Sequence, residues 1–393
     1  MRNLGMRRSR RAVALFSALL LIVVACTSED SSDEPIKVGV LIQLTGPAGV
    51  FGPPSQEAAE LAIEEINAAG GAAGRQLELF IADDATDAQV AQEQARKLLN
   101  EDGVDVLIST ESSAARESVL PVVEEAGKPM LYTPLYEGGA CNDLLFNLGE
   151  VPDQQVEPVI PYIQTTYGGD TWFIVGDDYN WPRSLGEVAG RVIPEAGGTV
   201  VGEQYVPLGT SDFGTIINDI QSSEADLVMM TLVGSDAISF VQQLNEFGLG
   251  EDVRVFGLAM LDNILPALGD VEPVIASFGY FETLDTASNN EFLAALDAKF
   301  GNDRSQQTSL SESTYMAIHL YAQAVEQAGT TETEAVLDAL EGQTFDAPRG
   351  SVTIDGSSRH VAQHIYVAES TADGNFSVLE DFGTIDPGSQ CSS

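Results

Sequence analysis

The sequence predicts an α/β fold with two lobes, each holding a parallel β-sheet covered by helices. From Ile36 onward, short apolar runs alternate with stretches in which apolar residues recur at helical spacing. Such alternation is typical of βαβ units, whose strands pair in parallel. The alternation restarts near Glu150, and a chain of 393 residues is long enough for two domains of ordinary size.

The first half opens with the apolar run "IKVGVLI" at 36–42, which predicts a buried strand. In the next stretch, 55–67, alanine and isoleucine recur at helical spacing, and Gly70 and Gly71 follow as a stop signal. Five further elements continue the alternation: a strand at 77–84, a helix at 87–100, a strand at 105–110, a helix at 113–126 and a strand at 128–134.

The second half begins at "EVPDQQ", residues 150–155, and repeats the alternation. Its predicted helices lie at 154–167, 182–195, 213–223 and 235–247, and its predicted strands at 171–178, 199–208, 226–233, 254–260 and 276–281. Three helical stretches follow, at about 290–300, 311–328 and 332–341, and strands are expected at 350–355, 360–369 and 375–382.

These elements predict how the chain divides between the lobes. We expect the first lobe to hold 36–150 plus 281–352 and the second to hold 151–280 plus 353–386, with a tail at 387–393. The chain would then cross the hinge three times. Open parallel sheets bind ligands at the carboxyl ends of their strands, so a ligand is expected in the cleft between the lobes.

The N-terminus carries a targeting signal. Residues 1–11 contain five arginines and no acid, and 12–25 are almost wholly apolar but too short for the roughly 20 residues of a membrane span. The run Val23-Val24-Ala25-Cys26 resembles the bacterial lipobox. We therefore expect 1–25 to be a signal peptide, Cys26 to be lipidated, 26–35 to be a flexible tether, and the body to lie at the cell surface or in the periplasm. The alternative is an ordinary signal peptide with an incidental cysteine.

The composition excludes several classes of function. The chain carries 60 acidic residues against 18 Lys and Arg, a net charge of −42, which repels nucleic acid and anionic lipid. No C-x-x-C occurs, and His319, His360 and His364 form no ligand cluster, so no metal site is expected. The sequence also lacks G-x-G-x-x-G spacing after the first strand, a P-loop and a G-x-S-x-G elbow. We therefore expect no cofactor and no enzymatic activity.

Two cysteines follow Cys26 in the chain, Cys141 and Cys391. A disulfide is permitted outside the cytoplasm, so these residues either pair or remain free thiols. The sequence leaves both alternatives open.

Several stretches resemble a known family. They are the opening "GVLIQLTGPAGVFG" (39–52), "RESVLPVVEEAGKPMLYTPLYEGG" (116–139), "DDYNWPRS" (177–184), "YVPLGTSDF" (205–213), "LVGSDAISFVQQL" (232–244) and "GQTFDAPRGSVTIDG" (342–356). Together they resemble the solute-binding proteins of ABC importers, within the branched-chain amino acid type, and specifically the urea and short-chain amide binders. The resemblance implies a type I periplasmic binding protein fold with two Rossmann-like lobes. It also implies a monomer that binds a small polar solute and delivers it to ABC permease subunits, with no ATP site of its own.

The resemblance further implies a set of cleft residues at strand ends. They are Glu111, Ser112, Ser113, Tyr132, Tyr136, Glu137, Tyr179, Trp181 and Asp236. The serines begin a helix, where hydroxyl and backbone N–H groups either meet a ligand oxygen or simply cap the helix. The aromatic residues would stack on a planar amide or pack in a lobe core. The two acids after the strands at 128–134 and 226–233 would contact the ligand, act at the hinge, or remain solvated.

Glu111 departs from the urea and amide binders, which place an aromatic residue before the serine pair. A buried carboxylate opposite a neutral ligand is costly unless donors satisfy it. The ligand is therefore either a neutral amide, which we favour, or an amino acid or small cation neutralised by this acid and Asp236. An alternative of another class is a ligand-sensing regulatory subunit with the same fold, although the lipobox argues against a cytoplasmic role.

Overall fold

Two β-sheets organise the part of the chain that the computed structural model describes, which is Met1 and residues 34–391. The predicted signal peptide, Cys26 and most of the predicted tether lie outside the described residues. Among the helices of the described part, none has the length and apolar character needed to cross a bilayer.

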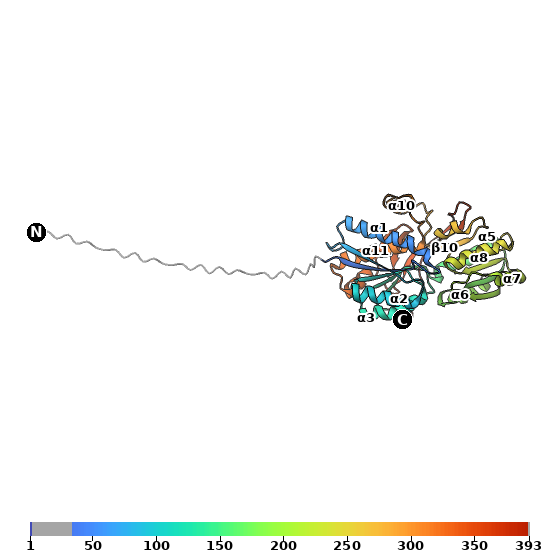
Figure 1. Ribbon diagram of the computed structural model, residues 1–393, viewed down its shortest axis with the longest axis horizontal. Coiled ribbons are helices and arrows are strands. Elements are labelled where there is room, and N and C mark those ends of the chain that lie inside the picture. Colours follow the sequence, from blue (N-terminus) through green and yellow to red (C-terminus); the bar gives the residue numbers. More distant parts are fainter. Residues whose placement is uncertain (2–33, 392–393) are drawn as a thin grey trace. The chain divides into compact units, whose positions relative to one another are not determined.

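The first sheet is wholly parallel, in the order β2-β1-β3-β4-β5. Its strands are β1 (Ile36–Ile42), β2 (Leu77–Asp83), β3 (Val106–Ser109), β4 (Met130–Tyr132) and β5 (Leu145–Asn147). Its helices are α1 (Gly52–Ala68), α2 (Ala88–Arg96), α3 (Ser113–Ala126), α10 (Ala287–Phe300), α11 (Ser309–Ala328) and α12 (Thr333–Leu340), and a π-helical turn, Lys97–Asp102, extends α2. In Figure 1, α1 and α11 lie on one side of this sheet, and α2 and α3 on the other.

The second sheet has the order β11-β12-β13-β10-β9-β8-β6-β7, with β14 paired to β13. Its strands are β6 (Thr171–Asp177), β7 (Thr199–Val206), β8 (Leu227–Thr231), β9 (Arg254–Gly257), β10 (Ile275–Phe278), β11 (Thr344–Ala347), β12 (Gly350–Ile354), β13 (Val361–Ser370) and β14 (Phe376–Ile385). Strands β6 to β10 are parallel, as predicted. Strands β11 to β14 pair antiparallel, an orientation that was not predicted for these C-terminal strands. The helices of this half are α4 (Pro152–Gln155), α5 (Val159–Tyr167), α6 (Asn180–Glu195), α7 (Gly214–Ser223), α8 (Gly234–Glu246) and α9 (Leu265–Leu268).

We call the part built on the first sheet the first lobe, and we include β11 and β12, because Ala347, Val352 and Ile354 share its core. The part built on β6 to β10 is the second lobe. Alternate residues of β1 enter two different cores: Val38 and Val40 pack with α1 and α11, whereas Leu41 packs with α2 and α3. Ala48 and Phe51, which follow β1, instead pack with the core of the second lobe. The loop after β1 therefore bridges the lobes. The residue boundaries of the lobes stay a prediction.

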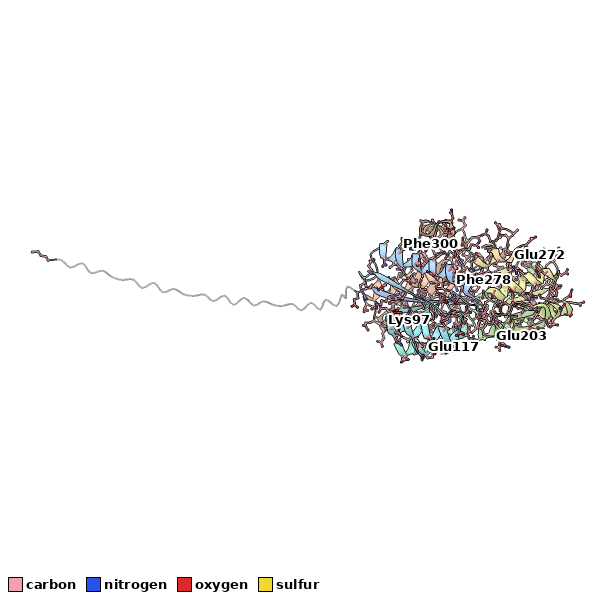
Figure 2. The ribbon with its side chains drawn as sticks, in the orientation of Figure 1. Lys97, Glu117, Glu203, Glu272, Phe278 and Phe300 are labelled. Atoms are coloured by element: carbon pink, nitrogen blue, oxygen red, sulfur yellow. A yellow bond between two sulfur atoms is a disulfide. The ribbon has the colours of Figure 1, made fainter. Side chains whose placement is uncertain are left out.

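The acidic side chains lie mainly on the outside. Figure 2 shows Glu117 and Glu203 at the periphery of the molecule, whereas Phe278 lies in its interior. Glu203 is exposed and Phe278 is fully buried. Dispersed exposed carboxylates keep such a surface hydrated and limit self-association.

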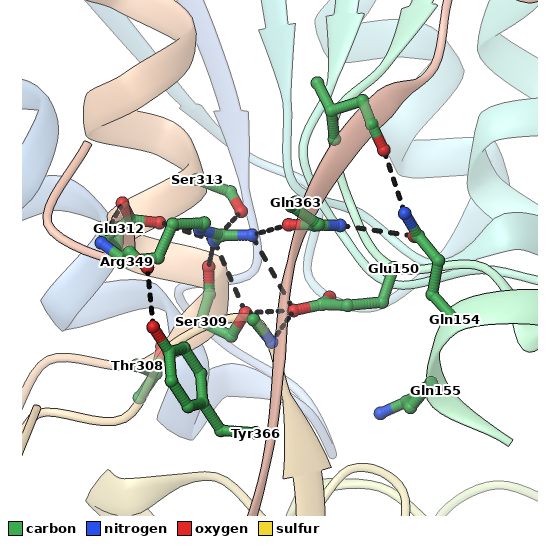
Figure 3. A network of polar contacts seen from close by, with 12 residues as sticks. Glu150, Gln154, Gln155, Thr308, Ser309, Glu312, Ser313, Arg349, Gln363 and Tyr366 are labelled. Atoms are coloured by element: carbon green, nitrogen blue, oxygen red, sulfur yellow. Dashed lines mark hydrogen bonds and ion pairs between the residues drawn. The ribbon is translucent and has the colours of Figure 1, made fainter. Parts of the chain in front are cut away.

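A buried polar network surrounds Arg349 at the place where chain segments of the two lobes meet (Figure 3). The Arg349 guanidinium donates from Nε to Glu312 at 2.5 Å and from Nη2 to the Ser313 hydroxyl at 2.6 Å, and its Nη1 donates to Gln363. Glu150 lies 3.7 Å from Nη1 and accepts from the Gly279 N–H at 2.7 Å. Arg349 thus joins α11, which carries Glu312, to Gln363 in β13, with Glu312 and Glu150 as its carboxylate partners.

Cys141 and Cys391 form a disulfide, with their Cα atoms 5.8 Å apart. The bond joins the loop after β4 to the C-terminal tail across 250 positions of sequence. Gln390 adds to the junction, because its Oε1 accepts from the Gly139 N–H at 3.1 Å. The tail that follows β14 is therefore fixed to the first lobe.

Reduction of this disulfide is expected to lower the free energy of unfolding, because cross-linking so long a loop restricts the unfolded chain. The chain-entropy estimate is on the order of 4–5 kcal/mol, an upper value. Urea unfolding with and without a phosphine reductant measures the difference. A variant carrying Cys141→Ser and Cys391→Ser should match the reduced parent and ignore the reductant. Equal midpoints for oxidised and reduced parent would contradict the expectation.

Candidate ligand-binding site

A cavity of about 50 Å³ lies at the carboxyl ends of strands from both sheets. The loops after β1, β2, β3 and β4 line it on one side, and those after β6, β7, β8 and β9 line it on the other. Six of the nine predicted ligand-binding residues line it: Glu111, Ser112, Ser113, Tyr132, Tyr179 and Trp181. The remaining lining residues were not in that set: Gln43, Ala48, Phe51, Thr86, Pro134, Leu135, Leu208, Val233, Ala259, Leu261 and Leu310.

The other three predicted residues, Tyr136, Glu137 and Asp236, lie outside the lining and have protein partners. The Tyr136 hydroxyl meets Nε2 of His360. Asp236 is fully buried and accepts from the backbone N–H groups of residues 209 and 210 at 2.7 and 2.9 Å. Glu137 pairs with Arg116, with 2.6 Å between Oε1 and Nη2. Asp236 thus fixes the loop after β7, and the predicted ligand contacts of these three residues have no support in the geometry.

Glu111 places a buried carboxyl group in the cavity wall. Its Oε2 accepts from the Ser109 hydroxyl, while its Oε1 is buried and has no hydrogen-bond partner among the described residues. Burial raises the pKa of Glu111 to about 8, the charge of Asp84 adds to the rise, and the Ser109 hydrogen bond opposes it. This carboxyl group is therefore largely protonated near neutral pH, with one oxygen free for a ligand.

The N-terminus of α3 supplies hydrogen-bond donors beside this carboxyl group. Ser112 is the N-cap residue, and its hydroxyl accepts from the Ala115 N–H at 3.2 Å. The N–H groups of Ser113 and Ala114 lie in the first turn, where a helix offers them no internal acceptor. Ser112 therefore caps the helix, and the first turn still presents N–H groups suited to an oxygen atom of a ligand.

Three aromatic residues form the walls that flank these polar groups. The Tyr132 hydroxyl donates to the Glu111 carbonyl at 2.9 Å and is fully buried, so this ring is part of the first lobe's core as well as of the cavity. The rings of Tyr179 and Trp181 lie 6.3 Å apart in the second lobe. Nε1 of Trp181 is buried, and nothing in residues 34–391 accepts its hydrogen. Trp181 thus brings an unpaired indole N–H to a residue of the cavity lining, as Glu111 brings an unpaired carboxyl oxygen.

Arg116 was missed by the sequence reasoning, although it lies within a stretch that carries the resemblance. Its guanidinium is buried between the rings of Tyr132 and Tyr136, 5.0 and 4.9 Å from their centres. It supports one wall of the cavity from behind without lining it. An arginine in the first turn of a helix gives no local signal of this role. The role arises from two tyrosines that lie elsewhere in the sequence and pack against the guanidinium.

Contacts between the lobes close the cavity. The Ser235 N–H donates to the Pro47 carbonyl at 3.1 Å, and Asn263 Nδ2 donates to the Val50 carbonyl at 2.7 Å. Both acceptors belong to the loop after β1, and both donors belong to the second lobe. The structure therefore describes the closed arrangement of the two lobes.

The stability of the protein is expected to fall as pH rises from 5 to 8, partly through Glu111. Its folded pKa of about 8 exceeds its ordinary value of 4.5, so the folded state holds a proton that the unfolded state has lost in this window. At about 1.4 kcal/mol per pKa unit, the effect is on the order of a few kcal/mol. Thermal unfolding at several pH values should show a shallower decline in Glu111→Gln than in the parent. The exposed Glu125→Gln serves as control, and equal slopes in all three proteins would contradict this role.

Comparisons with known proteins agree with this architecture. A family model described as periplasmic binding protein matches residues 35–375. The leucine-, isoleucine-, valine-, threonine- and alanine-binding protein of Pseudomonas aeruginosa is 26% identical over 355 residues, covering 88% of this chain and 92% of the relative. Leu/Ile/Val-binding protein homolog 7 of Brucella suis is 27% identical, covering 86% and 87%.

Solved structures show the same fold. The solute-binding protein of an ABC transporter from Rhodopseudomonas palustris HaA2, in complex with p-hydroxybenzoic acid, matches with a TM-score of 0.83 and 24% identity, covering 90% of this chain and 99% of that one. An ABC transporter substrate-binding protein from Sphaerobacter thermophilus matches with a TM-score of 0.78 and 26% identity, with the same coverage. With a family model spanning nearly the whole described chain and two lobes enclosing a cavity, this chain belongs to the periplasmic binding protein family.

Proposed function

We propose that this protein is the solute-binding component of an ABC importer and that it carries a small neutral amide-like solute, urea or a short-chain amide. It works outside the cytoplasm, as its family implies, and as a monomer held at the membrane by lipidated Cys26. Solved relatives named as ABC transporter solute-binding proteins support the transport role. Binding of the solute favours the closed conformation, and the permease distinguishes this closed conformation from the open one.

The observation that carries the choice of ligand is a pair of buried polar atoms without hydrogen-bond partners among the described residues, Oε1 of Glu111 and Nε1 of Trp181. Both residues line the same cavity. A compact solute such as urea or acetamide has both kinds of group needed to pair them.

The chemistry of the lining favours a neutral ligand. The lining residues include no lysine, arginine or histidine, so a free carboxylate would find no cation there and would meet only neutral donors. Glu111 offers a buried acceptor oxygen, and Trp181 offers a buried donor. An amide has N–H groups that can donate to Glu111 and a carbonyl oxygen that can accept from Trp181 or from the first turn of α3. Leaving such buried groups unpaired costs about 1–3 kcal/mol each, so a ligand that pairs them gains affinity.

An amino acid is the second candidate, because curated relatives are named for binding leucine, isoleucine and valine. In that case the ammonium group would meet ionised Glu111, and the carboxylate would meet the first turn of α3. A small cation would use the same acid without the α3 contact.

Isothermal calorimetry on the mature chain with urea, acetamide, guanidinium and leucine distinguishes these ligands. We expect urea or acetamide to bind and leucine and guanidinium to bind far more weakly. Repeating the titration in buffers of different ionisation enthalpy adds a second criterion. A cationic group would displace the proton of Glu111 at pH 7, whereas an amide would leave proton binding nearly unchanged. Tight binding of leucine together with proton release would overturn the amide proposal.

A further inference from the structure

Glu137 lies outside the cavity but collects hydrogen bonds from both lobes. Its Oε1 accepts from Arg116 at 2.6 Å and from Nδ2 of Asn180 at 3.0 Å. Its Oε2 accepts from the hydroxyl of Ser113. Arg116 and Ser113 belong to α3 of the first lobe, whereas Asn180 is the first residue of α6 in the second lobe.

Two of these partners lie directly beside the cavity. Ser113 lines it, and Asn180 precedes Trp181, which lines it from the second lobe. A solute that contacts Ser113 would therefore touch a direct hydrogen-bond partner of Glu137. A solute that contacts Trp181 would touch the residue next to Asn180, the other partner of Glu137. We propose that Glu137 is a positioning residue that couples occupancy of the cavity to closure of the lobes.

The carboxylate of Glu137 is well held for this task. Arg116 is buried, and two tyrosine rings fix its guanidinium, so the ion pair has little freedom to rearrange. The side chain of Glu137 is only 13% exposed, which limits competition from water. Hydrogen bonds to an ionised acceptor are also stronger than neutral ones. The first lobe thus presents a preorganised acceptor, and Asn180 completes the contact only when the lobes meet.

A contact formed only in the closed state acts on release of the solute more than on capture. Its loss should raise the dissociation rate and leave the association rate nearly unchanged, since encounter takes place with the open form. A hydrogen bond to a charged group is stronger than one to a neutral group, so a dissociation rate at least tenfold faster is expected. The inference requires only that a solute occupies this cavity, and in that respect it rests on the proposed function.

Asn180→Ala removes the cross-lobe donor without touching the cavity lining. Asn218→Ala is the matched control, because Asn218 is exposed in α7 and its Nδ2 donates to the Gly214 carbonyl at 2.7 Å. Stopped-flow fluorescence of Trp181 with acetamide, and in parallel with leucine, gives the two rate constants. We expect faster dissociation in Asn180→Ala alone, with thermal unfolding midpoints of the solute-free protein equal to the parent.

Closure is measured separately and without dependence on the solute. Spin labels on Glu125→Cys in α3 and Glu187→Cys in α6, both exposed positions, report the distance between the lobes. In Asn180→Ala the distances should shift toward the open form, both with and without the probes. Binding of leucine rather than acetamide would contradict the proposed ligand but leave this result intact. Dissociation rates and distances that both match the parent would overturn the role of Glu137. If neither acetamide nor leucine binds, the distances in the solute-free protein show whether Asn180→Ala opens the lobes.

Discussion

Arg349→Met is expected to lower the free energy of unfolding by about 3–5 kcal/mol, the typical cost of breaking a buried ion pair by removing one partner. The side chain of Arg349 is fully buried and donates to Glu312, Ser313 and Gln363. Glu312 is fully buried and Glu150 almost fully, so the variant leaves two carboxylates close together without a cation. Figure 3 shows the Arg349 guanidinium with Glu312, Ser313 and Gln363 around it.

The loss should depend on pH in a defined direction. Burial already raises the pKa of Glu312, and Arg349 opposes that rise. Without the arginine the folded pKa is higher still, so the folded state of the variant takes up a proton that the unfolded state releases. The destabilisation is therefore smaller at pH 5 than at pH 8.

Chemical unfolding of the mature chain in urea, at both pH values, measures the effect. Adding Glu312→Gln to the arginine substitution should recover part of the lost stability, because it removes one stranded charge. Arg183→Met serves as control: Arg183 pairs with Asp178 on the surface, where both side chains are about half exposed, and its loss should leave the midpoint almost unchanged. If both arginine variants unfold at the parent's midpoint, the network does not hold the hinge.

The elements were predictable where local signals agree with tertiary packing. The predicted helix at 113–126 matches α3 residue for residue, because a serine cap begins it and Gly127 ends it in a left-handed conformation. The predicted helix at 154–167 is wrong as one element: it is split into α4 and α5, since a proline at 158 disfavours helical geometry in the residue before it. Strands β5 and β11 were missed because they are only three and four residues long and are defined by their pairing partners.

The site was predictable to the extent that parallel strand ends converge. The residues placed after β3, β4 and β6 reach one cavity because those ends face each other across the lobes. Tyr136 and Asp236 also follow strands, but their side chains turn to protein partners, and sequence position does not reveal that direction. The apolar wall from Leu208, Val233 and Leu310 was missed because such residues in a loop or helix look like ordinary core residues.

Gly234→Ala is expected to weaken solute binding by about 30- to 150-fold, corresponding to roughly 2–3 kcal/mol lost from the closed state. Gly234 begins α8 with a φ of +52°, and a Cβ built on it would lie 2.3 Å from the Pro47 carbonyl oxygen. The position of the new Cβ is fixed by the backbone of residue 234, and the atom it meets is a backbone oxygen. No side-chain rotation therefore relieves the clash. The lobes must separate locally, which also removes the bond from Ser235 to Pro47.

The expected loss of affinity comes from the clash with Pro47 and not from the left-handed backbone conformation. Gly248 allows these two effects of an added Cβ to be separated. Gly248 follows the other end of α8 with a φ of +79°, and a Cβ there would have no atom within 4 Å. Gly248→Ala should therefore share the conformational cost of about 1 kcal/mol in stability but bind solute like the parent. Calorimetry with acetamide and leucine gives the affinities, and thermal unfolding without solute gives the stabilities. Pro47 belongs to the first lobe and Gly234 to the second, so a contact made on closure predicts that the first glycine affects affinity and that Gly248 does not. Equal affinities for the two variants would mean that the lobes bind solute without approaching as closely as they do here.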